Sequence, residues 1–212
     1  MEEREVRVPA SAVTLEGSLG IPDGAVGVVL FAHGSGSGRH SPRNRLVAQS
    51  LREAGLATLL VDLLTPQEEE VDLGTRRLRF DVGLLAERLA GATDWLARQA
   101  DTRDLRVGYF GASTGAGAAL VAAAERPGVG AVVSRGGRPD LAGEALTRVA
   151  APTLLIVGGE DEPVLEMNRE AFARMRAEKE LEIVPGATHL FGEPGKLEEV
   201  ARLAAGWFAR HL

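Results

Sequence analysis

The sequence predicts an α/β domain with an open, doubly wound and mostly parallel sheet, an antiparallel hairpin at its N-terminal end and no cap domain. Three observations support this prediction. Short apolar runs recur along the chain, segments with helical period separate them, and the opening stretch alternates between apolar and polar residues instead. Such alternation of strands and helices is typical of a parallel sheet covered on both faces.

The apolar runs are rich in Val, Ile and Leu, and turn residues close each of them. Continuous apolarity without alternation is typical of strands that are buried on both faces of a sheet. Six runs of this kind predict parallel strands at 27–32, 56–61, 105–110, 129–134, 152–157 and 180–184.

The segments between these runs predict the helical crossovers that parallel neighbours require. One of them begins with Ser41 as N-cap and Pro42 in the first turn, and Gly55 marks its end. The predicted helices lie at about 41–54, 80–100, 115–126, 167–178 and 196–211.

The remaining segments complete the domain. Residues 5–22 alternate and predict an antiparallel hairpin at one edge of the sheet. The charged residues 63–79 predict an irregular loop, long enough to form a mobile rim. Residues 135–151 leave room for a turn and a short helix, too little for a lid domain. Because no linker or repeat divides the chain, we expect one domain over residues 1–212.

Composition excludes several classes of function. The chain is 45% hydrophobic and 25% charged, which is typical of a globular protein. Its apolar runs are far shorter than the roughly 20 residues that cross a bilayer, so no membrane partner is expected. A net charge of −6 with dispersed basic residues argues against a nucleic-acid partner. The N-terminus is charged at once and lacks an apolar signal segment, which favours a cytoplasmic location.

The sequence also lacks the signatures of common cofactor sites. It has no cysteine, which excludes a disulfide framework, a thiolate metal site and a cysteine nucleophile. It has no His-x-x-x-His pair, and the glycine-rich stretch 111–117 does not end in the Lys-Ser/Thr of a phosphate-binding loop. We therefore expect no metal and no organic cofactor.

Polar residues follow three of the predicted strands at the point where each ends. Ser113 follows the run 105–110 within Gly-Ala-Ser-Thr-Gly, Asp161 follows 152–157, and His189 follows 180–184. In open α/β sheets, ligands bind beyond the carboxyl ends of the strands. We therefore expect these three side chains at one edge of one sheet.

The residue types at this edge fit nucleophilic catalysis. A serine hydroxyl becomes a nucleophile when an imidazole takes its proton and a carboxylate orients that imidazole. Gly-x-Ser-x-Gly places the serine in a strained strand-to-helix turn, where side chains at Gly111 or Gly115 would collide with the neighbouring strand and helix. The helix that begins near Thr114 directs unpaired N–H groups at the site, where an oxyanion would form.

The order Ser, Asp, His, together with His-Gly-Ser-Gly at 33–36, Gly-Gly-Glu-Asp at 158–161 and Gly-Ala-Thr-His at 186–189, resembles the α/β-hydrolase fold. The small, lid-less form is similar to the dienelactone-hydrolase-like group. The resemblance implies Ser113 as nucleophile, His189 as general base and then acid, and Asp161 as its partner. It also implies an oxyanion hole made by the backbone N–H groups of Ser35 and Thr114.

The sequence differs from this family in one residue that bears on the substrate. Dienelactone hydrolases proper use a cysteine nucleophile, whereas this chain has a serine. The lactone substrate of that family is therefore not carried over, and an acyl ester is the expected substrate.

Several residues keep two interpretations at this stage. Asp140, which follows an earlier strand, is the alternative to Asp161 as the acid of the triad. His33 is expected to fix its loop rather than to take part in chemistry. Arg135 and Arg138 either bind an anionic group of the substrate or serve as helix caps and partners of acidic residues.

The sequence thus predicts a serine hydrolase that cleaves small, soluble carboxylic esters through an acyl-enzyme. Without a lid, the pocket is expected to be open and shallow. A thioesterase or a lactonase would use the same residues and is the alternative within enzymes. A non-catalytic binding protein on the same fold is the alternative outside them. The sequence makes no prediction of oligomeric state.

Overall fold

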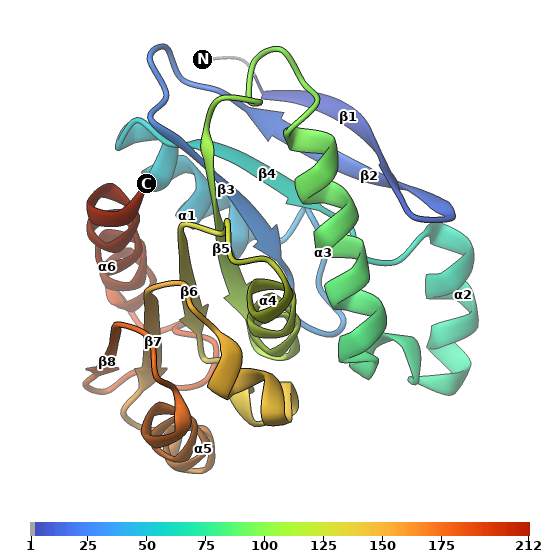
Figure 1. The fold of residues 1–212 in the computed structure, drawn as a ribbon. Coiled ribbons are helices and arrows are strands. Elements are labelled where there is room, and N and C mark those ends of the chain that lie inside the picture. Colours follow the sequence, from blue (N-terminus) through green and yellow to red (C-terminus); the bar gives the residue numbers. More distant parts are fainter. Residues whose placement is uncertain (1–2) are drawn as a thin grey trace.

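A computed structural model of the protein describes residues 3–212. Its centre is one eight-stranded sheet with the order β1-β2-β4-β3-β5-β6-β7-β8 (Figure 1). The six strands β3 to β8 run parallel to one another. Strand β2 pairs antiparallel with β4, and β1 and β2 form an antiparallel hairpin. The strand bounds are β1 Glu3–Ala10, β2 Val13–Gly20, β3 Gly27–Ala32, β4 Ala57–Val61, β5 Arg106–Ala112, β6 Ala131–Arg135, β7 Thr153–Gly158 and β8 Lys179–Val184.

Helices cover both faces of this sheet, as a doubly wound fold requires. Helices α1 and α6 pack on one face, and α3, α4 and α5 on the other (Figure 1). The helix bounds are α1 Pro42–Glu53, α2 Pro66–Thr75, α3 Val82–Leu96, α4 Thr114–Glu125, α5 Glu162–Arg174 and α6 Lys196–His211, with short 3-10 segments η1 Leu78–Phe80 and η2 Pro139–Arg148. The predicted fold class is confirmed.

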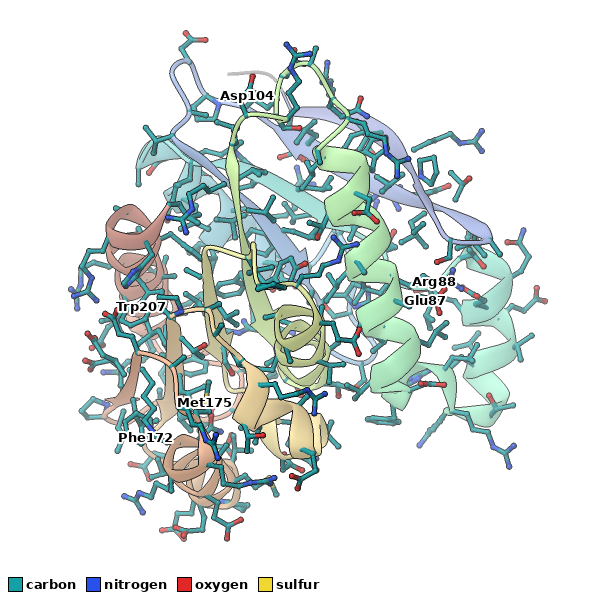
Figure 2. All side chains as sticks on the ribbon, viewed as in Figure 1. Glu87, Arg88, Asp104, Phe172, Met175 and Trp207 are labelled. Carbon is teal, nitrogen blue, oxygen red and sulfur yellow. The ribbon has the colours of Figure 1, made fainter. Side chains whose placement is uncertain are left out.

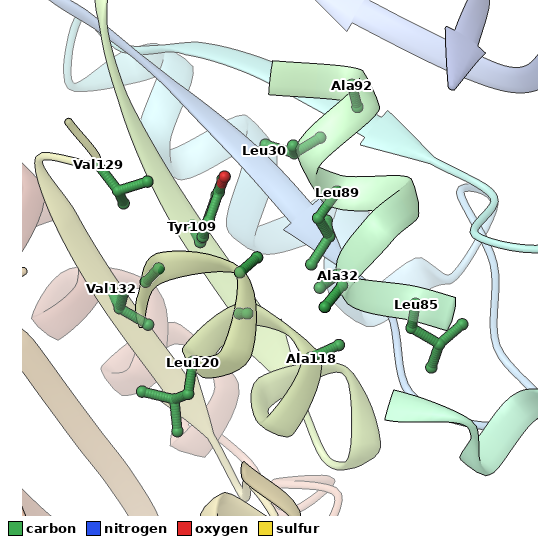
Figure 3. Packing of buried hydrophobic residues seen from close by; sticks show 14 of the residues in the cluster. Leu30, Ala32, Leu85, Leu89, Ala92, Tyr109, Ala118, Leu120, Val129 and Val132 are labelled. Atoms are coloured by element: carbon green, nitrogen blue, oxygen red, sulfur yellow. The ribbon is translucent and has the colours of Figure 1, made fainter. Parts of the chain in front are cut away.

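The two larger hydrophobic clusters of the described residues lie on opposite faces of the sheet, because successive strand residues point to opposite faces. On the α3 and α4 side, Leu30 and Tyr109 from the strands belong to one buried cluster with Leu89 and Ala118 from the helices (Figure 3). On the other side, Trp207 of α6 is fully buried against the strands (Figure 2). Burial on both faces explains why the central strands read as continuous apolar runs.

The prediction of an irregular loop at 63–79 is wrong, because most of this segment is helical. Helix α2 begins after Thr65, whose side chain accepts from the Glu68 N–H while the Glu68 carboxylate accepts from the Thr65 N–H, a capping box. Arg88 reaches from α3 toward α2 (Figure 2), where its Nη2 donates to Glu68 at 2.8 Å. Helix α2 has no apolar stripe to signal it, since Val71 and Leu73 are exposed.

Helix α5 also differs from its expected bounds, since it begins at Glu162 rather than near 167. The connection after β6 contains only η2, so residues 3–212 include no separate cap domain, as predicted. Within these residues no helix combines the length and apolarity needed to cross a membrane.

Candidate active site

Ser113 occupies the turn between β5 and α4 in a conformation that L-residues rarely adopt, with φ 49° and ψ −121°. Backbone hydrogen bonds on both sides of the residue hold this turn. The Ser113 N–H donates to the Arg135 carbonyl at 3.2 Å, and the Ser113 carbonyl accepts from the Arg138 N–H at 3.0 Å. Strained residues of this kind persist only where the surrounding structure fixes them, and they cluster at functional sites.

The two flanking glycines make this turn possible. A Cβ atom on Gly111 would lie 2.4 Å from Ala116 Cα, and one on Gly115 would lie 2.2 Å from the Ala32 carbonyl oxygen. Both neighbours are backbone atoms and cannot move aside cheaply. The collisions predicted from Gly-x-Ser-x-Gly are thus confirmed, the first with helix α4 and the second with the end of β3.

His189 and Asp161 are in direct contact. The His189 Nδ1 lies 2.7 Å from Asp161 Oδ2, and the Asp161 side chain is 13% exposed. Asp161 is the N-cap residue of α5, yet its side chain accepts no hydrogen bond from that helix. An N-cap aspartate ordinarily accepts from the first turn, so here the carboxylate serves the imidazole instead.

The loop that carries His189 is fixed from both sides. The Glu160 N–H donates to the Ala187 carbonyl at 3.0 Å. On the outer side, Thr188 donates to Glu193 from its hydroxyl at 2.5 Å and from its N–H at 3.2 Å. The Thr188 hydroxyl in particular holds the pKa of the Glu193 carboxyl below its usual value. The imidazole therefore sits on an anchored loop rather than on a free one.

A single turn, residues 135–138, links the histidine to the serine. The backbone groups of Arg135 and Arg138 form hydrogen bonds with the backbone of Ser113. Between these two residues, Gly136 packs against the His189 loop. A Cβ atom on Gly136, which has φ +49°, would lie 3.1 Å from the His189 carbonyl oxygen and 3.6 Å from its Nδ1. The structure thus brings Ser113, Asp161 and His189 to the carboxyl ends of β5, β7 and β8, as expected.

The loop after β3 lies against the serine from the other side. A Cβ atom on Gly34 would lie 3.2 Å from Ser113 Cβ, and Ser35 follows directly. Thr114 is 2% exposed at the start of α4. The backbones of Ser35 and Thr114 therefore flank the serine, where the sequence predicts an oxyanion hole.

His33 fixes this loop, as expected. The Leu63 N–H donates to His33 Nε2 at 2.9 Å, which leaves the proton on Nδ1 to donate to the Gly34 carbonyl at 3.0 Å. Burial lowers the pKa of His33. The ring is thus a neutral bridge between the loop and the strand end next to it.

A cavity of about 560 Å³ opens beside this loop. Residues of the loop, of α2 and of the end of β4 line it, with polar groups such as Ser37 and Asp62 and apolar ones such as Leu64 and Leu85. Asp62 also accepts from the Arg39 N–H at 2.6 Å and so anchors the far end of the loop. Within residues 3–212, no group of three acidic or histidine side chains is arranged to hold a metal ion.

The remaining candidate residues, Arg135, Arg138 and Asp140, differ in their partners and in their burial. Arg138 makes a two-bond fork to Asp140 at 2.9 and 2.8 Å, which occupies both side chains. This pairing corresponds to the acidic-partner interpretation of Arg138 and leaves Asp161 as the carboxylate that contacts His189. Arg135, in contrast, is buried beside the site with only 6% exposed. Arg43 lines the cavity at the start of α1 and was not singled out from the sequence.

A family model and a solved structure show the family of this chain. The family model of the dienelactone hydrolase family matches residues 15–210. A crystal structure of a dienelactone hydrolase from Anabaena variabilis shares 65% identity with a TM-score of 0.98, and the match covers 100% of this chain and 98% of that one. Est1E from Butyrivibrio proteoclasticus has a TM-score of 0.80 at 16% identity, covering 97% of this chain and 98% of that one, which shows the same fold.

A curated relative carries a different kind of name. A Mycobacterium tuberculosis protein named putative phosphoribosyl transferase is 60% identical over 213 residues, covering 100% of this chain and 47% of that protein. The chain therefore spans about half the length of this relative.

Proposed function

Because the chain belongs to the dienelactone hydrolase family of α/β hydrolases, we propose that it hydrolyses small, soluble carboxylic esters through an acyl-enzyme on Ser113. The observation that carries this proposal is the contact between His189 and Asp161. Asp161 occupies the N-cap position of α5, but its carboxylate contacts the His189 imidazole instead of the helix. The turn 135–138 lies against both the His189 loop and the strained Ser113.

The proposed reaction assigns a role to each of these residues. His189 takes the proton of the Ser113 hydroxyl as the oxygen attacks the ester carbonyl, and Asp161 stabilises the imidazolium that forms. The N–H groups of Ser35 and Thr114 donate to the oxyanion of the tetrahedral intermediate. The intermediate collapses, His189 gives its proton to the leaving alcohol, and the acyl group remains on Ser113. Water then attacks the acyl-enzyme by the same steps and releases the acid.

The cavity supports a small substrate. Its volume of about 560 Å³ lies within the range of ligand pockets, which is about 300–1,000 Å³. The lining mixes hydroxyl, carboxylate and guanidinium groups with a few leucines. A long lipid chain would leave these polar groups without partners, so a short acyl group fits better.

Thioesters and lactones pass through the same tetrahedral intermediate and remain alternatives. A short oxygen ester and its thioester assayed side by side would rank them. Phosphoribosyl transfer is not proposed for this chain, because the hydrolase family match covers residues 15–210 whereas the relative that carries the transferase name is about twice as long.

A fluorophosphonate probe, which reacts with activated serines, tests the proposal. We expect it to label the protein, to fail on Ser113→Ala, and to label the matched control Ser37→Ala, since Ser37 lies in the neighbouring loop. Labelling that persists in Ser113→Ala, or a folded parent protein that takes no label, would refute the proposed nucleophile and favour a binding role.

A further inference from the structure

The loop between β3 and α1 carries one of the two proposed oxyanion donors, the Ser35 N–H. The loop opens with a tight turn, in which the Ser37 N–H donates to the Gly34 carbonyl at 3.1 Å. Gly36, the third residue of this turn, has φ +71°, whereas Ser35, the second, has no positive φ. This combination defines a type II turn, whose own hydrogen bond comes from the fourth residue and does not use the N–H of the second.

The two proposed oxyanion donors are supported differently. Thr114 is the first residue of α4 and is 2% exposed, so the helix and the core fix its N–H. Ser35 is exposed and lies in a loop outside the helices and strands. An oxyanion donor acts only when it is held about 2.7–3.1 Å from the developing charge. The Ser35 N–H therefore needs support from residues elsewhere in the molecule.

Arg39 anchors the far end of this loop. Its N–H donates to Asp62 Oδ1 at 2.6 Å, and its guanidinium forms an ion pair with Asp62 Oδ2. The same guanidinium lies 2.8 Å from Glu16 Oε2 and 3.3 Å from Glu5 Oε2. Within residues 3–212 no other arginine has three carboxylate partners. Because the Arg39 side chain is only 14% exposed, salt and water screen these contacts less than they screen surface ion pairs.

The three carboxylates that hold this arginine are themselves fixed to the edge of the sheet. Glu5 and Glu16 belong to β1 and β2, and Asp62 directly follows β4. The Asp62 N–H donates to the Glu16 carbonyl at 2.9 Å, and Glu5 accepts from the Ser18 hydroxyl at 2.8 Å. A Cβ atom on Gly38 would lie 2.7 Å from Asp62 Oδ1, so the loop backbone packs directly on this carboxylate. The hairpin and the end of β4 thus form a fixed base for the loop.

Arg39 lies outside the cavity beside the serine. Every other residue from Gly34 to Ser41 lines that cavity, whereas Arg39 lines a separate groove with Glu5 and Glu16 on the hairpin side of the loop. A substrate in the cavity therefore does not touch the guanidinium, and an effect of Arg39 on the reaction has to pass through the loop.

We propose that Arg39 is a positioning residue for the oxyanion hole. By binding Asp62 and Glu16, it holds the loop so that the Ser35 N–H meets the oxyanion. The hairpin of β1 and β2, at the edge of the sheet, thereby becomes part of the catalytic framework (Figure 1). This inference rests on the proposed function, since it explains how one donor of the same site is held.

The first test compares Arg39→Met and Arg39→Lys with the parent protein, with 4-nitrophenyl butyrate as substrate. Propaneboronic acid, which forms a tetrahedral adduct with an active serine, mimics the transition state, and butyramide mimics the ground state. We expect Arg39→Met to lower both kcat/KM and the affinity for the boronic acid by about 10- to 100-fold, less than complete loss of a donor would. The affinity for butyramide should change by less than about twofold, because the donor acts mainly in the transition state. Arg39→Lys should recover part of both losses, since lysine keeps the charge but not the planar fork.

A double-variant cycle tests whether Arg39 acts through Ser35. Proline has no N–H and fits the second position of a type II turn, so Ser35→Pro removes the donor and keeps the turn. This variant should lower kcat/KM by about 100- to 1,000-fold. Adding Arg39→Met to it should change kcat/KM by less than about twofold, because the donor that Arg39 positions is already absent. Two effects that multiply would overturn the proposal.

Arg45→Met is the matched control. Arg45 also forms an ion pair with the hairpin, at 3.4 Å from Glu3, but it belongs to α1 rather than to the loop. This control should keep the parental kcat/KM. If urea unfolding shows that Arg39→Met folds poorly, Glu16→Gln serves as the second variant and should lower kcat/KM and the affinity for the boronic acid by about 2- to 5-fold.

The outcomes separate the two proposals. If the parent cleaves the ester and neither Arg39→Met nor Glu16→Gln lowers kcat/KM or the affinity for the boronic acid, the positioning role is overturned and the hydrolase proposal stands. Equal losses of affinity for the boronic acid and for butyramide would also overturn the positioning role, because they would show a general collapse of the site. If the parent cleaves no ester and binds no boronic acid, the proposed function falls and this inference falls with it.

Discussion

Replacing Arg135 with methionine removes a buried charge that the described residues do not neutralise, and we expect the variant to be more stable than the parent. Methionine keeps much of the length and apolar volume of the side chain. Burial first, and Arg43 second, lower the pKa of Arg135 to about 10. One pKa unit corresponds to about 1.4 kcal/mol, so this fall from the usual pKa of arginine corresponds to about 3 kcal/mol of destabilisation.

The sign of this effect follows from proton binding. A base whose pKa is lower in the folded state binds its proton more weakly there than in the unfolded chain. The cost is fully present at neutral pH and is relieved only as the pH rises above about 10. Because water and relaxation reduce such costs, we expect a gain of about 1–3 kcal/mol in the free energy of unfolding. For a chain of this size, each kcal/mol raises the melting temperature by about 2–4 °C.

Urea unfolding in a chloride buffer without phosphate or carboxylates measures this gain. Arg88→Met is the matched control, because Arg88 is as buried as Arg135 but is paired with Glu68 and the Ala10 carbonyl. This control should lose about 1–3 kcal/mol, since it leaves acceptors unpaired. A loss of stability in Arg135→Met similar to that of Arg88→Met would show that the Arg135 guanidinium has a stabilising partner, and the reasoning would fail.

Three further predictions concern the other parts of the site. The Asp161→Asn variant should fold normally and have a kcat lower by about 10³- to 10⁴-fold, because the amide no longer stabilises the imidazolium. Steady-state ester hydrolysis measures this change. An unchanged kcat would show that Asp161 has no part in the mechanism. Gly115→Ala places a methyl 2.2 Å from a backbone oxygen and should cost more than about 3 kcal/mol in urea unfolding. The control Gly206→Ala in α6 meets no atom within 4 Å and should gain up to about 1 kcal/mol; equal effects of the two would contradict the packing argument. Because burial lowers the pKa of His33, the unfolded chain takes up a proton at this histidine first, and stability should fall as the pH drops below about 6.5; a parallel pH profile for His33→Gln would exclude this ring as a source.

Much of the fold was predictable because its signals are local. Strand β3 begins and ends where the apolar run 27–32 does, since a strand buried on both faces admits few polar residues. Ser113 was visible for a related reason. Neighbouring backbone atoms lie so close to Gly111 and Gly115 that any larger residue would collide with them. The two glycines in the sequence therefore indicate the geometry of the turn.

Other features were missed because their signals are weak or not local. Helix α2 has a capping box at Thr65 and Glu68 that marks its start, but no apolar face that marks its length. The choice between Asp161 and Asp140 depends on which carboxylate the His189 loop reaches, and on the partner that Arg138 takes. Arg43 carries no local signal, because only the packing of α1 brings it near Arg135.

Helix α5 explains how residues so distant in the sequence keep a common geometry. Its N-cap residue, Asp161, binds His189, and two turns later Asn168, fully buried, donates from Nδ2 to the Gly137 carbonyl at 3.0 Å. Gly137 lies in the turn 135–138, which binds the Ser113 backbone on both sides. One helix therefore fixes the carboxylate and also the turn that holds the serine.

This arrangement also has a cost that points to function. Within residues 3–212 the Asn168 Oδ1 has no hydrogen-bond partner, and neither does the Ser134 hydroxyl, which lies under Gly137. Each unsatisfied buried polar group costs about 1–3 kcal/mol. An apolar side chain at position 168 would avoid the cost of the unpaired oxygen, but it would also remove the hydrogen bond to the Gly137 carbonyl. The presence of these two polar side chains beneath the turn 135–138 indicates that the exact path of this turn, and with it the placement of the serine relative to the histidine, matters more than the stability that is lost.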